Sequence, residues 1–293
     1  MLDYHLHLWQ HGPRPLEVTL EHVAAYCEQA KAHGVEEIAL TEHLHRFRQA
    51  DALLNGWWED ERIESTPALR AQMAAFWRED LGNGCDLDTY VEVVLAAKAE
   101  GLPVVLGLEV DWYEHRMDDV ATLLRGYPFD VLLGSVHWIG TWGFDNSGAD
   151  AFAEEWSNRR IEDVWEAYTR SLEELADSGA CDVLAHPDLV KIMGHLPRVP
   201  DEWHDRMAEA AARSGMAAEV SSAGWRKPVG EQYPAASLLQ RFNARGVPIT
   251  TATDAHTLDR VAERRDDVRQ VCVAAGYDAL QAYSARTPRR VEL

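Results

Sequence analysis

The sequence predicts an α/β fold in which helices alternate with parallel strands, and the strands form a closed or nearly closed barrel. Three observations predict it: short apolar runs recur along the chain, helical segments separate them, and chelating side chains follow most of the runs. Strands joined by single helices are parallel and have right-handed crossovers. Strands that are apolar along their whole length are typical of a sheet covered on both faces.

Seven apolar, β-branched runs are the candidate strands, and they cover residues 2–8, 36–41, 102–108, 129–136, 181–185, 216–220 and 247–251. Helical periodicity lies between them; in residues 161–175 the apolar side chains recur at steps of three and four. Gly34, Gly101, Gly215 and Gly246 each precede a candidate strand, which is typical of glycine at a helix C-terminus. The pattern alone leaves a doubly wound sheet open, because that fold alternates strands and helices in the same way.

Residues 44–88 interrupt this alternation. The stretch contains Trp57-Trp58 and Phe76-Trp77 among many charged residues, and we expect it to form a loop-and-helix excursion over the barrel mouth. No linker rich in Pro, Gly or Ser and no repeat of fixed period divides the sequence. We therefore expect one domain that covers residues 1–293.

The composition disfavours several classes of partner. Forty-nine acidic and 28 basic side chains give a formal charge of −21, which repels nucleic acid and anionic membranes and favours a small substrate. No apolar run approaches the ~18 residues of a membrane span, and the N-terminus lacks the pattern of a signal peptide. The four cysteines are far apart in the sequence and are expected to be reduced. We expect a cytoplasmic protein.

Six of the seven candidate strands carry or end in His, Glu or Asp. The segments are His5-Leu6-His7, Thr41-Glu42-His43, Gly107-Leu108-Glu109-Val110-Asp111, Ser135-Val136-His137, His186-Pro187-Asp188 and Asp254-Ala255-His256. In a (β/α) barrel the carboxyl ends of the strands meet at one face, which carries the chemistry. Independent polar caps would as often be Ser, Thr, Asn or Gly, so we expect a single site.

This mixture of imidazole and carboxylate suits Zn²⁺, Fe²⁺ or Mn²⁺, whereas the absence of cysteine from it argues against a structural zinc site. The set has more ligands than one ion needs. It therefore predicts a multinuclear centre, with Glu109 as a natural bridging carboxylate. Because metal ions generate a nucleophile from water and offset charge on phosphoryl oxygens, hydrolysis of a phosphate ester is expected.

In their order along the chain these motifs resemble the polymerase and histidinol phosphatase (PHP) family. The segment from Glu219 to Pro228, followed by Tyr233-Pro234, resembles the histidinol-phosphatase branch in particular. The resemblance runs from about residue 2 to residue 258. It implies a distorted (β/α)₇ TIM-like barrel of the PHP type and hydrolysis of L-histidinol phosphate to L-histidinol and phosphate, a step of histidine biosynthesis.

The resemblance also implies two to three divalent ions of zinc, manganese or iron. Their ligands would be His5, His7, Glu109 and Asp254 for one ion, Glu109, His137 and His186 for a second, and His43 and His256 for a third. The third ion needs a further ligand. His11 is the natural candidate, although its spacing from the first histidine pair is shorter than usual in the family.

The hypothetical mechanism is an in-line attack on phosphorus by a metal-bridging hydroxide, with Glu109 as the bridging carboxylate. Asp254 or His256 is expected to protonate the leaving group, unless a metal-bound water does so, and the sequence leaves this choice open.

Cations at the barrel mouth should bind the phosphate, because a guanidinium offers paired donors to phosphate oxygens. By resemblance, Arg226 is the first candidate and Lys191 the second. Arg46, Arg48 and Lys227 are further candidates.

The remaining histidines are expected at the surface, since they lie on predicted helices or in polar loops: His22, His33, His115, His195 and His204. His45 lies two residues beyond His43 and is a candidate substrate contact. Three alternative functions stay open. They are hydrolysis of another phosphate ester (a nucleotide, a sugar phosphate or phosphotyrosine), a related metal-dependent amidohydrolase, and a non-catalytic or proofreading module of a polymerase.

Overall fold

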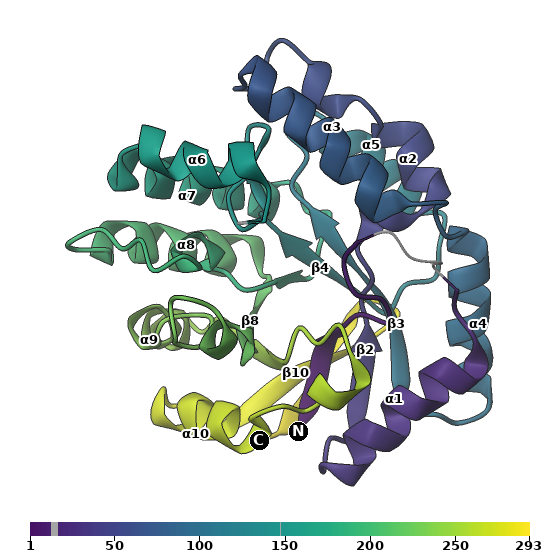
Figure 1. Cartoon of the computed structure of the whole chain (residues 1–293). Helices are drawn as coiled ribbons and strands as arrows, with labels where there is room; N and C mark the ends of the chain where they lie inside the picture. Colours follow the sequence, from purple (N-terminus) through teal and green to yellow (C-terminus); the bar gives the residue numbers. More distant parts are fainter. Residues whose placement is uncertain (13–16, 147) are drawn as a thin grey trace.

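The computed structural model describes residues 1–12, 17–146 and 148–293. Its centre is a parallel sheet with the strand order β1-β2-β3-β4-β7-β8-β9, surrounded by helices (Figure 1). The bounds are β1 Leu2–Leu6, β2 Glu37–Leu40, β3 Val104–Asp111, β4 Val131–Ser135, β7 Val183–Leu184, β8 Ala217–Ser221 and β9 Ile249–Ala252. Each of the seven predicted strands is confirmed, and every residue of β1, β3, β4 and β8 is buried.

The sheet closes on itself because β1 lies beside β9. The amide of His7 donates to the Ala255 carbonyl at 2.8 Å, and the Thr251 hydroxyl donates to the Leu2 carbonyl at 2.7 Å. A parallel bridge joins Leu6 to Ala255. This contact between the first and last strands makes the sheet a nearly closed barrel and rules out the doubly wound alternative.

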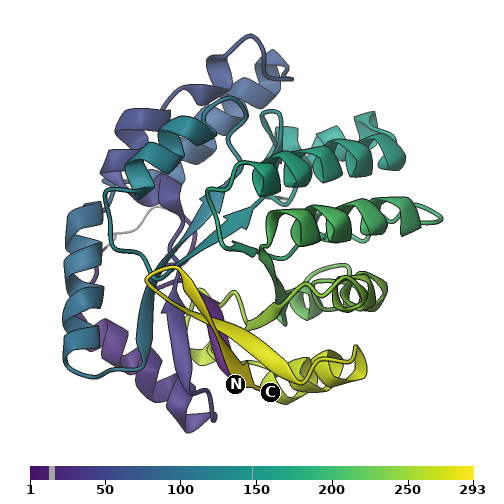
Figure 2. The same cartoon turned by 180° about the vertical axis from the view of Figure 1, so that it is seen from behind.

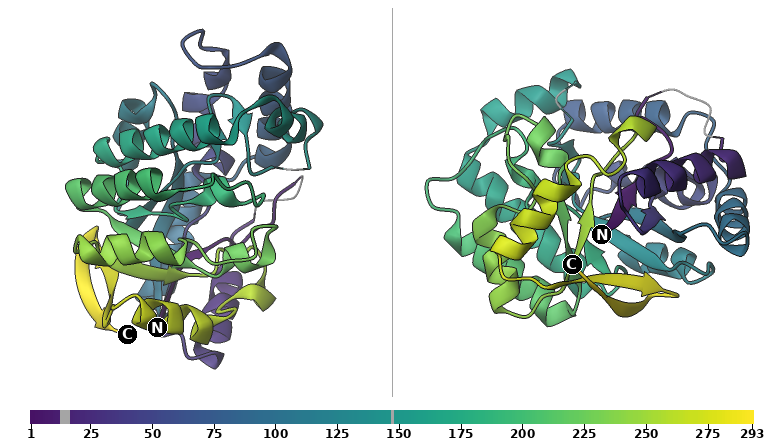
Figure 3. Two further views of the ribbon diagram at one scale, coloured as in Figure 1. Left: turned by 90° about the vertical axis from the view of Figure 1, so that its left-hand side faces the viewer. Right: turned by 90° about the horizontal axis from the view of Figure 1, so that it is seen from below.

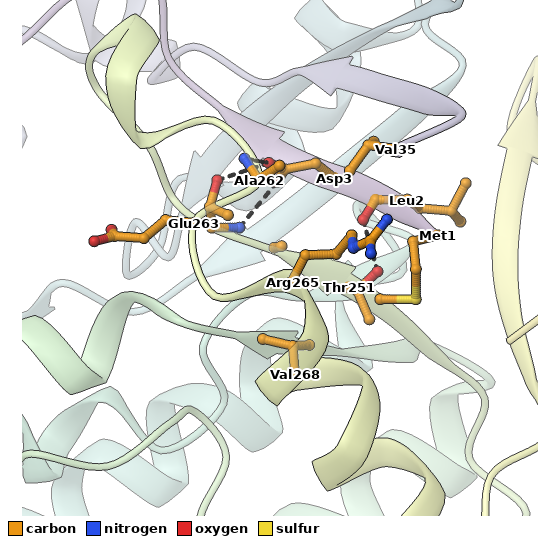
Figure 4. Close-up of a pocket in the computed structure, with 11 residues that line it drawn as sticks. Met1, Leu2, Asp3, Val35, Thr251, Ala262, Glu263, Arg265 and Val268 are labelled. Atoms are coloured by element: carbon orange, nitrogen blue, oxygen red, sulfur yellow. Dashed lines mark hydrogen bonds between the residues drawn. The ribbon is translucent and has the colours of Figure 1, made fainter. Parts of the chain in front are cut away.

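A buried carboxylate strengthens the same seam. Asp3 accepts hydrogen bonds from the Thr253 amide (2.9 Å), the Thr253 hydroxyl (2.8 Å) and the Ala262 amide (3.0 Å). Figure 4 shows Asp3 and Ala262 at one side of a small hollow of about 10 Å³, roughly the space for one water molecule. Burial raises the pKa of Asp3 to about 7.

Ten α-helices are present among the described residues. They are α1 Leu20–Ala32, α2 Arg48–Leu54, α3 Pro67–Leu81, α4 Leu87–Ala99, α5 Met117–Leu124, α6 Asp150–Asn158, α7 Ile161–Asp177, α8 Asp201–Ser214, α9 Ala236–Ala244 and α10 Arg265–Ala274. The periodic segment at residues 161–175 forms α7, which buries Val164, Trp165, Tyr168 and Leu172. The four glycines predicted at helix ends all have positive φ.

The long connection between β2 and β3 contains the short 3₁₀ helices η1 (Leu44–Arg46) and η2 (Trp57–Glu59) together with α2, α3 and α4. In α3, Pro67 occupies the first turn and the Thr66 hydroxyl accepts a hydrogen bond from the Leu69 amide, which together begin the helix. Figure 1 shows α2 and α3 grouped at one side of the barrel, away from the chain termini.

Two antiparallel hairpins were not predicted. One pairs β5 (Trp138–Ile139) with β6 (Trp142–Gly143), and the other pairs β10 (Ala279–Ser284) with β11 (Thr287–Glu292). The second hairpin crosses the back of the barrel in Figure 2. It is anchored near the beginnings of several strands: Arg289 pairs with Glu37, and Arg286 pairs with Asp182 at 3.0 Å.

The chain termini lie close together in both views of Figure 3. All four cysteines are buried and free of disulfides, as predicted. Among the described residues, no helix is both long enough and apolar enough to cross a membrane.

Candidate metal centre

The barrel mouth opens into a cavity of about 1010 Å³. Eight of the predicted site residues line it: His11, His43, Glu109, His137, His186, Arg226, Asp254 and His256. His5 and His7 are fully buried in contact with Glu109. Helix α3, within the predicted excursion, adds Gln72, Met73, Phe76, Glu79 and Asp80 to the wall.

Glu109, on β3, is the centre of the cluster. Five imidazoles surround its carboxylate, at 3.2 Å (His5 Nε2), 3.5 Å (His7 Nε2), 2.8 Å (His43 Nδ1), 3.5 Å (His137 Nε2) and 3.0 Å (His186 Nε2). The imidazoles come from the ends of four different strands and from the chain that follows them. A parallel barrel brings these side chains together because it gathers all its strand ends at one face.

Many of the buried atoms here have no hydrogen-bond partner in the part of the chain that the structure describes. They include His5 Nε2, both ring nitrogens of His7 and of His43, Glu109 Oε2 and His256 Nε2. Such atoms are rare in protein interiors, because burial removes their hydrogen bonds to water without replacement. Nitrogen atoms that surround a carboxylate without hydrogen-bond geometry suit divalent cations. The donor set therefore fits metal ions.

Four groups of three side chains hold donor atoms within 4.8 Å of one another. They are His5, His7 and Asp254; His5, Glu109 and His186; His7, His43 and His256; and His43, Asp111 and His137. The first group is part of the set that the resemblance implies for one ion, and the third contains both residues implied for another. The rings of His43 and His256 also lie 5.1 and 4.7 Å from the ring of His11.

Burial and neighbouring charges shift the pKa values of the cluster in different directions. Burial alone would raise the pKa of Glu109, but His5, His43 and His137 hold it well below its usual value. Burial lowers the pKa of His43 and of His256 well below the usual value. Burial opposes a raised pKa in His5, His7 and His137 as well, but neighbouring carboxylates outweigh it and raise the pKa of all three. Of these groups, Glu109, His43 and His256 are shifted toward the protonation state that metal coordination requires.

Two carboxylates to which the sequence analysis assigned no separate role hold the far sides of the imidazoles. Glu219, inside β8, contacts His5 Nδ1 at 2.7 Å, and Asp111 contacts His137 Nδ1 at 2.5 Å. A carboxylate on one ring nitrogen fixes the tautomer and directs the other nitrogen at a metal. A signal for both was present: Glu219 is a charge in an apolar strand, and Asp111 follows Glu109 at the two-residue step that shares a face.

The backbone is strained at two of the predicted ligands. His186 has a φ of 27° and Asp254 a φ of 52°. Residues other than glycine seldom adopt positive φ, and such strain concentrates at functional sites. The seventh strand end thus presents Asp254 in a conformation that the surrounding structure must stabilise.

The predicted phosphate ligands differ in position. Arg226 lines the cavity and donates to the Thr253 carbonyl at 3.0 Å and to Glu263 at 2.5 Å. Lys191 is fully buried outside the cavity lining, and its ammonium contacts Asp188 (2.9 Å) and Glu231 (2.7 Å). Carboxylates therefore hold both cations in this structure, and of the two only Arg226 lines the cavity.

Two further candidates for phosphate binding also pair with carboxylates. Arg46 is fully buried between Glu42 (3.2 Å) and Asp80 (2.9 Å), and Arg48 pairs with Asp86 at 3.0 Å near the surface. Lys227 is exposed at the cavity wall.

The expectation of a surface position is wrong for His204, which is 2% exposed. It lies on α8 and contacts the Ser237 hydroxyl at 3.1 Å. Packing of α8 against α7 and α9 buries it, and periodicity in the sequence did not indicate which helix face it would occupy. His33, His115 and His195 are exposed and His22 is partly buried. His45 lines the cavity but bonds to Asp80 at 2.8 Å.

Comparison with known proteins agrees with this arrangement. The family profile of the PHP domain matches residues 5–223. A protein of Deinococcus radiodurans named "Probable histidinol-phosphatase" is 32% identical over 248 residues, which are 84% of this chain and 85% of that protein.

The fold is shared with solved structures. The histidinol phosphate phosphatase of Lactococcus lactis, in complex with zinc, L-histidinol and phosphate, covers 98% of this chain and 98% of its own, with a TM-score of 0.71 and 21% identity. A Listeria monocytogenes structure covers 91% of this chain and 99% of its own, with a TM-score of 0.69 and 17% identity. The extent of the profile match and of the Deinococcus alignment shows that this chain belongs to the PHP family.

Proposed function

We propose that this protein is a metal-dependent phosphomonoesterase that hydrolyses L-histidinol phosphate to L-histidinol and phosphate in histidine biosynthesis. The observation that carries the proposal is the convergence of five imidazoles on the Glu109 carboxylate at the floor of an open cavity beside Arg226. The substrate follows from similarity to the Deinococcus protein, and the ligands of the Lactococcus structure support it.

We propose that two to three ions of zinc, manganese or iron bind here. Their ligands would be His5, His7, His11, His43, Glu109, His137, His186, Asp254 and His256, with Glu109 shared. When bound, the ions supply a nucleophile from water near neutral pH and stabilise negative charge on the phosphoryl group. Glu219 and Asp111 contact the Nδ1 atoms of His5 and His137, which would leave the Nε2 atoms of both rings available to the ions.

The chain's own residues would orient the phosphate and move the proton. Arg226 offers its guanidinium to the phosphoryl oxygens while Glu263 and the Thr253 carbonyl hold it in place. Asp254 and His256, each about one-fifth exposed at the cavity, are the candidates to protonate the leaving alkoxide. Glu109 is the third residue of the proposed catalytic set, because the ions would share its carboxylate.

Other residues of the cavity lining suit the organic part of the substrate. They include Phe76, Trp138 and Phe152, and an imidazole ring can pack against such aromatic faces. Asp145 also lines the cavity. It lies near His137, whose pKa burial lowers and whose pKa Asp111, Glu109 and, to a smaller extent, Asp145 raise. A carboxylate would repel a simple phosphate ester, but it attracts the ammonium group that histidinol phosphate carries. We propose that Asp145 binds this ammonium.

We propose that the whole chain forms one catalytic domain, in which residues 44–88 lie beside the cavity. This placement is supported by helix α3, which contributes side chains to the cavity wall. We also propose that Lys191 has a structural role, because its ammonium is already bound by Asp188 and Glu231. The protein would act in the cytoplasm on a small phosphorylated substrate, without nucleic acid or membrane partners.

The test is phosphate release by protein reconstituted with Mn²⁺ or Zn²⁺, with kcat/KM compared between L-histidinol phosphate and a panel of nucleotides, sugar phosphates and phosphotyrosine. We expect a preference of ~10³-fold, equivalent to ~4 kcal/mol of transition-state binding. Equal hydrolysis of the whole panel would retain the metal site and refute the substrate. Hydrolysis of amides without phosphatase activity would support an amidohydrolase instead.

A further inference from the structure

Asp80, at the end of α3, is a buried carboxylate that joins the excursion helix to the metal centre. It is 3% exposed and contacts His45 Nε2 (2.8 Å), Arg46 Nε (2.9 Å), His11 Nδ1 (3.2 Å) and the Gly12 amide (3.1 Å). These partners lie on two segments, one after β1 and one after β2. One side chain of α3 therefore holds both segments together.

The contact with His11 has a chemical consequence. A carboxylate can only accept a hydrogen bond, so His11 Nδ1 must carry the proton when it bonds to Asp80, which leaves a lone pair on Nε2. Arg46 Nη2 lies 3.1 Å from the same Nδ1. A guanidinium can only donate, so a bond from Arg46 would require the opposite tautomer, with the proton on Nε2. Only the tautomer bound to Asp80 lets His11 coordinate a metal through Nε2.

His11 depends on this contact for its position as well. Its side chain is 54% exposed, unlike His43 and the other buried ligands. The His11 ring nevertheless lies within 5.1 Å of the rings of His43 and His256, measured between centroids. A half-exposed imidazole loses this position readily unless a second residue restrains it.

The remaining contacts of Asp80 explain why its own position is fixed. Arg46 is fully buried and also donates to Glu42 Oε2 at 3.2 Å. Glu42 in turn accepts from the amides of Leu8 and Trp9, in the segment that leads to His11. The buried charges therefore form a closed network, and removal of one leaves the others uncompensated.

We propose that Asp80 is a positioning residue: it selects the metal-binding tautomer of His11 and thereby couples helix α3 to the third ion of the centre. The proposal rests on the function proposed above, since it needs a metal bound by His11, His43 and His256. Helix α3 would thereby do more than line the cavity, because it must pack against the barrel before His11 can coordinate a metal ion.

The test measures binding of Zn²⁺ alone by competition with a chromophoric chelator, for the wild type and for the variants Asp80→Ala, His11→Ala and the double variant. We expect Asp80→Ala to weaken the last Zn²⁺ bound about 10- to 100-fold. In the His11→Ala background, the same change should have little further effect, because the two residues act as one unit. Asp80→Asn keeps an acceptor oxygen and should lose less affinity. Arg78→Gln, at an exposed position of α3, is the matched control.

The outcomes separate this inference from the proposed function. If the wild type binds no Zn²⁺, the metal site and the inference fail together. If the wild type binds Zn²⁺ and Asp80→Ala retains its affinity, only the role of Asp80 is refuted. A thermal destabilisation of Asp80→Ala without loss of Zn²⁺ affinity, or equal losses with and without His11, would likewise show a purely structural role.

Discussion

Histidine is buried in two regions of this molecule, and the two differ in what surrounds the ring. At the barrel mouth, five imidazoles face Glu109, and most of their inward nitrogens lack hydrogen-bond partners. Between α8 and α9, His204 is a single ring that contacts Ser237 and lies 5.8 Å from the Trp165 ring, measured between centroids. Its Nε2 likewise has no hydrogen-bond partner among the described residues. Burial is similar in both regions, so burial alone does not identify a ligand.

The distinguishing features are convergence and support. Several donors share one small volume at the mouth, and carboxylates hold the outer nitrogens of His5 and His137. His204 has no carboxylate within ion-pair distance among the described residues. A metal site therefore requires converging donor atoms and carboxylates that hold the outer ring nitrogens. Mutation can remove each of these features separately.

The largest effect should come from Glu109→Gln, which removes the shared negative charge. We expect kcat/KM to fall by at least ~10³-fold and metal content, measured by mass spectrometry, to fall with it. Circular dichroism should show that the fold is retained. His137→Ala should also lower both kcat/KM and metal content. Full metal content and activity in either variant would contradict the ligand assignment.

An intermediate effect is expected from Glu219→Gln, which keeps the shape of the side chain but removes the charge behind His5. Metal affinity should fall about 10- to 100-fold, because the outer partner fixes the tautomer and orientation of the ligand. Excess metal in the assay should restore much of kcat. A loss that excess metal leaves unchanged would point to a different role for Glu219.

A smaller and selective effect should follow from Asp145→Asn. The kcat/KM for L-histidinol phosphate should fall about 10-fold, as expected for loss of one charged hydrogen bond. The analogue that lacks the amino group should be hydrolysed as well as before, and metal content should not change. Equal losses for both substrates would refute ammonium recognition by Asp145.

The smallest effect is expected from His204→Gln, and it should concern stability only. Burial lowers the pKa of His204 below the value of about 6.5 that it has in the unfolded chain. As the pH falls below that value, the unfolded state binds the proton first, so the free energy of unfolding decreases.

Denaturant unfolding at pH 8 and pH 5.5 should show a weaker pH dependence for His204→Gln than for the wild type, with kcat unchanged. An equal pH dependence would mean that the folded protein accommodates the charged ring.

The sequence was sufficient to predict the alternating strands and helices, because hydrophobic periodicity and strand-end chemistry are local patterns. It located all seven barrel strands, but their register and the closure of β1 on β9 depend on contacts across the whole chain. The hairpin β10–β11 was missed. Its second strand is almost fully exposed and contains Pro288 and two arginines, so no apolar alternation marks it.

For the candidate site, residue type and position predicted the residues that surround Glu109, but not the partners that support them. Asp80 lies in α3, far from any strand end, and only the folded excursion brings it to His11. For Lys191, the sequence predicted a role in the site but not the surroundings of the side chain. This residue was selected by resemblance, yet whether an ammonium faces a cavity or a neighbouring carboxylate depends on side-chain packing that spacing does not encode.

The closure of the barrel determines when, during translation, the proposed metal site can form. β1 and β9 are in contact although the residues that bond, Leu2 and Thr251, are 249 positions apart in the chain. The proposed ligands divide in the same way: His5 and His7 lie in β1 and just after it, whereas Asp254 and His256 follow β9. The proposed site is therefore complete only after translation has passed His256, and its metal ions would be loaded after that point.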